Sequence, residues 1–134
     1  MPDTAALARR WFEEVWNERR EATIDELLSG DSVCYADQGD LRGVEAFRQQ
    51  QYLPFVGALP NLHVTVDDVL AEGEQAVVRW TAKGTHLGPG LGFDATGKTV
   101  ALRGMTWMRF KDGRLVEGWQ SSNVLEVLRS LKGD

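Results

Sequence analysis

The stretch Thr99-Val100-Ala101-Leu102-Arg103-Gly104-Met105-Thr106-Trp107-Met108-Arg109-Phe110 decides the fold class of this chain. Its side chains alternate with the period of two that is typical of a β-strand, which puts Arg103, Met105, Trp107 and Arg109 on one face. A strand of this length is long for a small domain. Long strands twist and curl, so the stretch predicts a curved sheet that can enclose a cavity.

Further strands are predicted on both sides of this stretch. Residues 63–68 and 76–86 alternate in the same way and are joined by a turn at 72–74. A glycine-rich loop at 87–97 leads into residues 99–110, and a second turn leads into a strand at 115–120. The second half of the chain therefore predicts an antiparallel meander, followed by a short apolar turn or helix.

The first half of the chain has mostly helical spacing. Residues 4–19 predict an amphipathic helix, and Thr23-Ile24-Asp25-Glu26 has the pattern of a capping box at the start of a short second helix. Residues 31–37 predict one strand, and a helix from residue 44 is expected to be ended by Pro54, then Gly57 and Pro60. Helices before a meander predict an α+β domain, in which a curved antiparallel sheet wraps around the N-terminal helices and a central pocket.

Size and charge restrict the function. The 134 residues suit a single domain, 1–134, and the net charge of 15 − 20 = −5 argues against nucleic acid or an anionic membrane as a partner. Cys34 is the only cysteine, so no internal disulfide is expected. No signal peptide or membrane-length apolar run is visible, and we expect a cytoplasmic protein.

Two apparent ligand motifs do not fit the predicted structure. Residues 92–99 match the phosphate-binding pattern G-x-x-x-x-G-K-[ST], but that site requires a helix after the loop, whereas a strand follows here. His63 and His86 lie in different predicted strands without metal-ligand spacing. We therefore expect neither a nucleotide site nor a metal.

Arginines within the apolar strands have two interpretations. Most charged side chains are exposed, so Arg79, Arg103 and Arg109 fit the solvated face of the sheet. Alternatively, some of them face the cavity as anion partners, with Trp107 covering their aliphatic stems.

Five stretches spread over nearly the whole chain carry a resemblance to a known family. They are Phe12-Glu13-Glu14-Val15-Trp16-Asn17, Pro60-Asn61-Leu62-His63-Val64-Thr65-Val66, Arg79-Trp80-Thr81-Ala82-Lys83-Gly84-Thr85-His86, Ala95-Thr96-Gly97-Lys98 and Asp112-Gly113-Arg114-Leu115-Val116-Glu117-Gly118-Trp119. In these stretches the chain resembles the SnoaL-like polyketide cyclases and related ester cyclases, within the nuclear transport factor 2-like superfamily. The resemblance implies a cone-shaped domain with a deep pocket, commonly dimeric through its sheet, and no cofactor. In those cyclases an aspartate four residues after a tryptophan is the acid/base.

The chain departs from the family at the residues that matter for catalysis. The position four residues after Trp119 is Asn123, whose amide has no titratable proton, although it can donate a hydrogen bond to an enolate oxygen. Cys34-Tyr35 stands where the family often has histidine. His86 matches the family's Gly-Thr-His stretch, and histidine titrates in a range that suits proton transfer.

Two hypotheses follow. The first is a cofactor-free cyclase, isomerase or dehydratase acting on an apolar carbonyl compound, with His86 and Asn123 catalytic and with Tyr35, Arg103, Trp107 and Trp119 binding the substrate. The second is a non-catalytic protein that binds a small apolar molecule in the same pocket, which the asparagine at 123 favours. A weaker third possibility, epoxide hydration, would require Asp67 or Asp68 beside Arg79.

Overall fold

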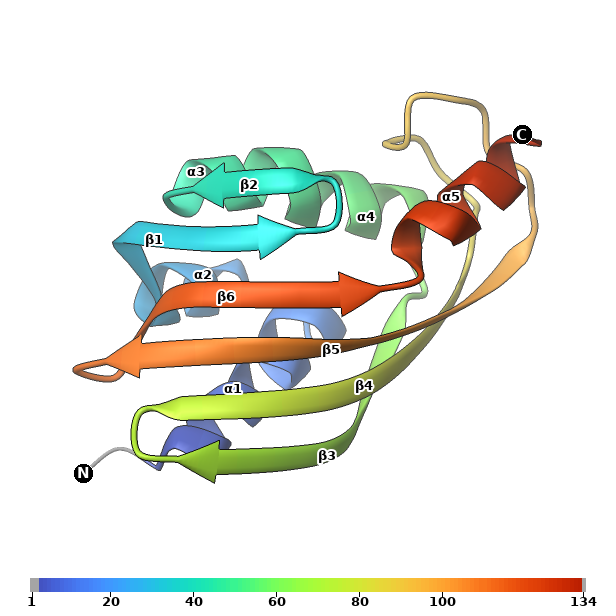
Figure 1. Cartoon of the computed structure of the whole chain (residues 1–134). Helices are drawn as coiled ribbons and strands as arrows, with labels where there is room; N and C mark the ends of the chain where they lie inside the picture. The colour runs from blue at the N-terminus through green and yellow to red at the C-terminus, as the bar shows by residue number, and fades with distance from the viewer. Residues whose placement is uncertain (1–2, 134) are drawn as a thin grey trace.

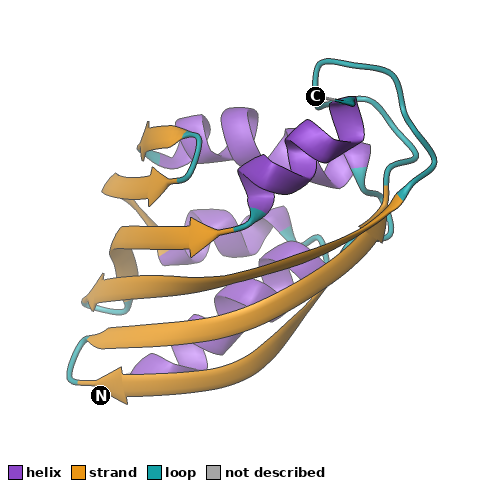
Figure 2. Ribbon diagram, turned by 45° about the vertical axis from the view of Figure 1, so that its right-hand side comes forward, coloured by secondary structure: helices purple, strands orange, loops and turns teal. Residues whose placement is uncertain are grey.

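A six-stranded sheet forms one layer of the structure, and helices cover one of its faces (Figures 1 and 2). The computed structural model describes residues 3–133 of the chain. The strands are β1 (Leu28–Ala36), β2 (Gly39–Arg42), β3 (His63–Glu72), β4 (Gln75–Thr85), β5 (Thr99–Lys111) and β6 (Arg114–Ser122). The helical segments are α1 (Thr4–Arg10) continued by η1 (Trp11–Asn17), α2 (Glu21–Leu27), α3 (Val44–Phe47) continued by η2 (Arg48–Tyr52) and α4 (Leu53–Ala58), and α5 (Val124–Lys132).

The α+β class and the curved sheet are confirmed. The long strands β3, β4 and β5 bend together toward the helices, and the sheet stays open rather than closing into a barrel (Figure 2). The predicted meander runs from β3 to β6 in antiparallel register. None of the helices in the described part of the chain is both long enough and apolar enough to cross a membrane.

The sequence predicted a wholly antiparallel sheet, but one pair of neighbouring strands is parallel. In the strand order β2-β1-β6-β5-β4-β3, the neighbours β1 and β6 are parallel, and Tyr35 lies opposite Trp119. Strand β2, for which the sequence analysis predicted no strand, pairs antiparallel with β1 and forms the sheet edge. Local alternation reveals strands, but it does not reveal which distant strand becomes a neighbour.

Two helix boundaries differ from the prediction. Pro54 does not end its helix, because it lies in the first turn of α4, directly after the π-helical turns of η2. The helix ends instead at Ala58, between the other two predicted breakers, Gly57 and Pro60. Thr23 is not an N-cap, because α2 begins at Glu21. The Thr23 side chain is instead fully buried and bonded to a neighbouring helix.

The core lies between the helices and the inner face of the sheet. Val78 and Trp80 on β4 and Met108 on β5 are buried on this face, whereas Arg79 and Trp107 are exposed on the other. The predicted alternation along β5 is therefore confirmed. The arginines on these strands lie on the outer face, which is the first of the two interpretations.

Candidate functional site

A small two-lobed cavity lies inside the fold between the sheet and the helices. The volumes of its lobes are about 50 Å³ and about 40 Å³. Both lobes are lined by Phe12, Trp16, Gln51 and Gln120, so we treat them as one interior cavity. The first lobe is completed by Gln38, Phe55, Leu62, Val64, Trp80, Ala82, Leu102 and Val124.

The polar part of the first lobe consists of glutamine amides. Gln38 comes from the turn after β1, Gln51 from η2 and Gln120 from the inner face of β6. Their amides make no side-chain hydrogen bond with another described residue, and the rest of the lining is apolar or aromatic. A few polar groups in an otherwise apolar hollow are typical of a site for small molecules.

The aromatic wall of the cavity is held in place by specific contacts. Trp80 donates a hydrogen bond from Nε1 to Thr106 Oγ1 at 3.0 Å, and its ring centroid lies 6.4 Å from that of Phe12. A Cβ atom added at Gly104 would come within 2.6 Å of Trp80 Cζ2. The glycine on β5 therefore provides the space that the indole ring occupies.

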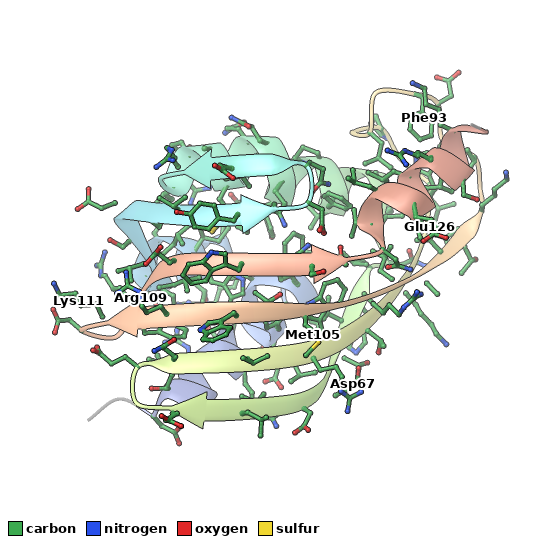
Figure 3. The ribbon with its side chains drawn as sticks, viewed as in Figure 1. Asp67, Phe93, Met105, Arg109, Lys111 and Glu126 are labelled. Carbon is green, nitrogen blue, oxygen red and sulfur yellow. The ribbon has the colours of Figure 1, made fainter. Side chains whose placement is uncertain are left out.

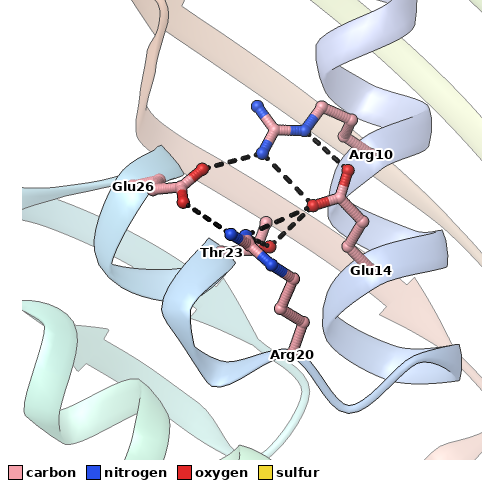
Figure 4. Close-up of polar contacts among 5 residues, drawn as sticks. All are labelled: Arg10, Glu14, Arg20, Thr23 and Glu26. Atoms are coloured by element: carbon pink, nitrogen blue, oxygen red, sulfur yellow. Dashed lines mark hydrogen bonds and ion pairs between the residues drawn. The ribbon is translucent and has the colours of Figure 1, made fainter.

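The helices behind the cavity are tied together by a cluster of charged side chains (Figure 4). Glu14 in η1 accepts hydrogen bonds from Arg10 at 2.7 Å and from Thr23 of α2 at 2.7 Å. Glu26 of α2 accepts from Arg10 at 2.8 Å and from Arg20 at 3.0 Å. The hydrogen bond from Arg10 is the main reason that the pKa of Glu14 is lowered. The cluster fixes η1, which carries two of the cavity-lining rings.

The aromatic residues predicted to bind substrate lie on the outer face of the sheet. Trp107 and Trp119 face each other across β5 and β6 with exposed fractions of 49% and 40%, and neither lines the cavity. Tyr35 borders the second lobe, but its ring stacks on Trp119 at 5.5 Å. Arg103 is exposed on the same outer face, where Figure 3 shows Met105 and Arg109. Of these four predicted binding residues, only Tyr35 borders the interior cavity.

His86 anchors the loop that follows β4. Its side chain is fully buried, its Nδ1 accepts a hydrogen bond from the Thr96 N–H at 3.2 Å, and its ring meets Phe93 edge-on at 5.3 Å. Its backbone also pairs with Gly97 and Lys98, which close the same loop. His86 Nε2 has no hydrogen-bond partner, and His86 does not line the cavity.

Asn123 joins the end of β6 to β5. Its Oδ1 accepts from the Arg103 N–H at 2.8 Å, and its Nδ2 donates to the Ala101 carbonyl at 3.4 Å. The amide is thus engaged with the backbone of the neighbouring strand, and it borders an outer-face hollow together with Arg103. The structure does not bring His86 and Asn123 together, and their catalytic roles stay predictions.

Asp37 is a polar residue of this region that the sequence analysis missed. It is half-buried after the end of β1, and its carboxylate accepts a hydrogen bond from the Oγ of Ser122, the last residue of β6. An aspartate after a strand is an ordinary turn residue. No local signal in the sequence distinguishes it.

The remaining titratable group at the cavity is a thiol. Cys34 lines the second lobe, and burial raises its pKa to about 11. It is therefore protonated at neutral pH and a poor nucleophile. Among the described residues, no group of three or more histidine, cysteine, aspartate or glutamate side chains is placed to hold a metal ion.

Solved structures with the same fold carry different proposed activities. A protein from Jannaschia sp. CCS1, proposed to be a SnoaL-like polyketide cyclase, superposes with a TM-score of 0.86 at 22% identity, covering 98% of this chain and 92% of that one. AclR, a proposed hydroxylase from Streptomyces galilaeus, superposes with a TM-score of 0.83 at 26% identity, covering 98% of this chain and 82% of AclR. IdmH, a proposed polyketide cyclase from Streptomyces antibioticus, superposes with a TM-score of 0.80 at 22% identity, covering 99% of this chain and 100% of IdmH.

The family assignment rests on the sequence as well as on the fold. No curated protein matches the sequence significantly. The family model for SnoaL-like polyketide cyclases, however, matches residues 6–131, which is nearly the whole described chain. The structure has the open, cone-shaped sheet of nuclear transport factor 2-like proteins. The chain belongs to the SnoaL-like polyketide cyclase family.

Proposed function

We propose that the interior cavity binds a small, largely apolar molecule that carries a carbonyl group. The observation that supports this proposal is the convergence of three uncommitted glutamine amides, Gln38, Gln51 and Gln120, on one apolar hollow. An amide N–H donates a hydrogen bond to a carbonyl oxygen, and the aromatic wall covers the apolar part of the ligand. A charged ligand would find no counter-charge among the residues that line the first lobe.

Binding requires the cavity to widen. A lobe of about 50 Å³ has room for a few water molecules rather than for a multi-ring compound. Gln38 lies on an exposed turn, so the cavity opens toward solvent beside the β1–β2 hairpin. We place ligand entry there, with the Gln38 side chain moving outward. A deep ligand pocket of the kind that the family resemblance implies stays a prediction.

Cofactor-free proton transfer, as in a cyclase or isomerase, is the second candidate function. Family membership favours it, because the family is named for polyketide cyclases. His86 and Asn123 remain its sequence-based candidates, although neither lines the cavity. Binding without catalysis is supported by the lining of the first lobe, which has no ionisable side chain among its described residues.

The binding proposal is tested with a pair of matched probes, 2-tetralone and tetralin, which differ in the carbonyl group. Quenching of tryptophan fluorescence reports binding, because Trp16 and Trp80 line the cavity. We expect 2-tetralone to bind more tightly than tetralin to the unmodified protein. In Gln51→Leu and Gln120→Leu the ratio of the affinity for 2-tetralone to that for tetralin should fall by roughly tenfold, because each variant loses about one neutral hydrogen bond to the carbonyl oxygen.

Gln49→Leu is the matched control, because Gln49 is exposed on the same helical turn as Gln51 and does not line the cavity. It should retain the preference for 2-tetralone. Equal affinity of the unmodified protein for both probes, or no binding of either, would contradict the proposed function.

We further propose that a second copy of the chain covers the outer face of the sheet. Tyr35, Trp119, Trp107, Val77 and Leu70 stand opposite one another in register from β1 to β3 and form one row across the sheet, the outer apolar row. Contiguous exposed apolar surface is uncommon on monomers. A two-fold axis through the face would lay one outer apolar row on its copy, as an isologous interface requires.

The proposed location is the cytoplasm. Cys34 is the only cysteine, so the fold does not depend on an internal disulfide and suits a reducing compartment. Fractionation of cells that produce the protein tests the location, which stays a prediction.

A further inference from the structure

One polar side chain of the interior cavity takes no part in the proposed function. Thr106 lies on the inner face of β5 and lines the second lobe, and it is only 9% exposed. Gln51 and Gln120 line both lobes, whereas Thr106 lines the second lobe alone. A buried polar group that leaves hydrogen-bonding capacity unused costs free energy, so the hydrogen bonds of Thr106 indicate what this lobe can hold.

The Thr106 hydroxyl accepts a hydrogen bond but donates none. Its Oγ1 accepts from Trp80 Nε1 at 3.0 Å. A threonine hydroxyl also carries one hydrogen of its own, and this hydrogen has no acceptor among the described residues. An atom that satisfies the hydroxyl from the cavity must therefore be a hydrogen-bond acceptor.

The hydrogen bond from Trp80 also fixes the position of the hydroxyl oxygen. The indole ring packs against Phe12 and passes close to Gly104, so its orientation is restricted. Its N–H is rigid with the ring, and the β-branched side chain of Thr106 has few rotamers. The hydroxyl is thus in place before a ligand enters, which lowers the entropic cost of binding.

Thr106 has a second donor as its neighbour across the strands. Gln120 on β6 stands directly opposite Thr106 on β5, and both side chains line the second lobe. Opposed residues on antiparallel strands have Cβ atoms about 5 Å apart. The cavity therefore holds two neighbouring donors, a glutamine amide shared by both lobes and a threonine hydroxyl in the second. Two donors so placed suit two acceptor atoms on one ligand.

The rest of the second lobe restricts the acceptor to a neutral group. None of the residues that line this lobe is cationic, and the Cys34 thiol is protonated at neutral pH. A carboxylate or phosphate would therefore be buried there without a counter-charge. The ring of Tyr35, which carries the other hydroxyl of the lobe, stacks on Trp119 of the outer face. An ether or ketone oxygen meets these conditions.

We propose that Thr106 is a specificity-determining residue that selects ligands with a second, neutral acceptor oxygen besides the carbonyl group. The inference rests on the proposed function and narrows its ligand class to carbonyl compounds that also carry an ether or a further ketone. The carbonyl oxygen lies at the glutamines, and the second oxygen accepts a hydrogen bond from Thr106 Oγ1. An apolar group in the same place leaves the hydroxyl hydrogen unpaired, and the site rejects it for that reason.

The test compares 2-tetralones that carry a methoxy group at ring position 5, 6, 7 or 8 with the ethyl compounds of the same substitution. Methoxy and ethyl groups are similar in volume, but only the methoxy group has an acceptor oxygen. Tryptophan fluorescence of the full chain measures each affinity. For at least one position, the ratio of methoxy to ethyl affinity should be roughly tenfold higher in the unmodified protein than in Thr106→Val, which lacks the hydroxyl.

Two further variants serve as controls. Thr106→Ser keeps the hydroxyl, and Thr81→Val changes an exposed threonine on β4, so both should keep the methoxy-to-ethyl ratio of the unmodified protein. Thr106→Val should still prefer 2-tetralone to tetralin, because its glutamines are unchanged. A purely structural role of Thr106 would instead weaken the binding of methoxy and ethyl compounds by the same factor and leave their ratio unchanged.

The outcomes separate this inference from the proposed function. If the unmodified protein does not prefer 2-tetralone to tetralin, both are overturned. If it does, but all four methoxy-to-ethyl ratios are the same in Thr106→Val, only the role of Thr106 is overturned. Thr106→Val also removes the acceptor of the Trp80 N–H, so its thermal unfolding midpoint is measured to show that it is folded. Where it is not, Thr106→Ala replaces it, because the smaller side chain leaves room for a water molecule at Trp80 Nε1.

Discussion

Glu14 and Thr23 join two helices through a half-buried hydrogen bond, in which Thr23 Oγ1 donates to Glu14 Oε1 at 2.7 Å. The same carboxylate is bonded to Arg10, so Glu14 is satisfied from its own helix and from α2. The consequence is a fixed η1, whose inward rings Phe12 and Trp16 line both lobes of the cavity.

Substitution of Glu14 should make stability less dependent on pH. The pKa of Glu14 is lower in the folded protein than in the unfolded chain. The contribution of Glu14 to the free energy of unfolding is therefore fully present above the unfolded-state pKa, and it is lost as the pH falls through the folded-state pKa. Glu14→Gln should lower the free energy of unfolding by about 1–2 kcal/mol at pH 7, and the difference from the unmodified protein should shrink toward pH 3. Urea unfolding of both proteins at pH 7 and at pH 3 measures this difference in the free energy of unfolding. Glu13→Gln, at an exposed position, is the control and should show no such difference.

An added methyl group at Gly104 should disturb the cavity wall. A Cβ there would lie 2.6 Å from Trp80 Cζ2 and 2.8 Å from Ser122 Cβ, so Gly104→Ala forces neighbours to move. We expect a loss of about 1–3 kcal/mol in stability and weaker binding of 2-tetralone. Gly118→Ala is the control, because its Cβ would meet nothing closer than 3.8 Å. Equal losses in both variants would contradict the role given to Gly104.

A charge in the outer apolar row should separate the proposed dimer. Trp107 and Trp119 pack edge-on at 6.4 Å in the middle of the row. At micromolar concentration we expect the unmodified protein to sediment as a dimer and Trp119→Lys as a monomer. Leu87→Lys changes an exposed apolar residue on the loop after β4 and should leave the dimer intact. A monomeric unmodified protein would refute the interface.

Removal of the His86 ring should loosen the loop at residues 87–98. His86→Ala deletes the acceptor of the Thr96 N–H and the edge-on contact with Phe93. We expect faster proteolytic cleavage within this loop and a lower unfolding midpoint. His63→Ala, at an exposed position on β3, should change neither. If the protein accelerates exchange of the α-hydrogens of 2-tetralone for deuterium in D₂O and His86→Ala abolishes this while the loop stays protected, the catalytic role predicted from the sequence is favoured over an anchoring role.

Much of the fold could be predicted from the sequence because its periodicities are strong. The alternation from Val100 to Phe110 predicted β5, and the turns at 72–74 and 111–114 predicted the order of the meander. Pro54 and Thr23 misled the prediction of helix boundaries because each has a local preference that tertiary structure overrides. The π-helical turns of η2 accommodate the proline, and Glu14 engages the threonine.

The site was harder to predict because alternation does not say which strand face is concave. Trp80 and Trp107 are both tryptophans in neighbouring strands, yet one lines the cavity and the other lies on the outer face. The glutamines that line the cavity come from three elements that are distant in sequence, so no spacing connects them. Asp37 and Ser122 are 85 positions apart and meet only through the parallel pairing of β1 with β6.

That parallel pairing also determines when the cavity can exist during synthesis. β1 takes its place beside β6, so the early helices and β1 emerge from the ribosome long before the strand that completes their sheet. Nascent chains that end before residue 114 lack β6, Gln120 and Ser122 and therefore expose the inner rings of η1 to water. Folding of the domain therefore waits for residues 114–122, and shorter chains carry exposed apolar surface that favours aggregation.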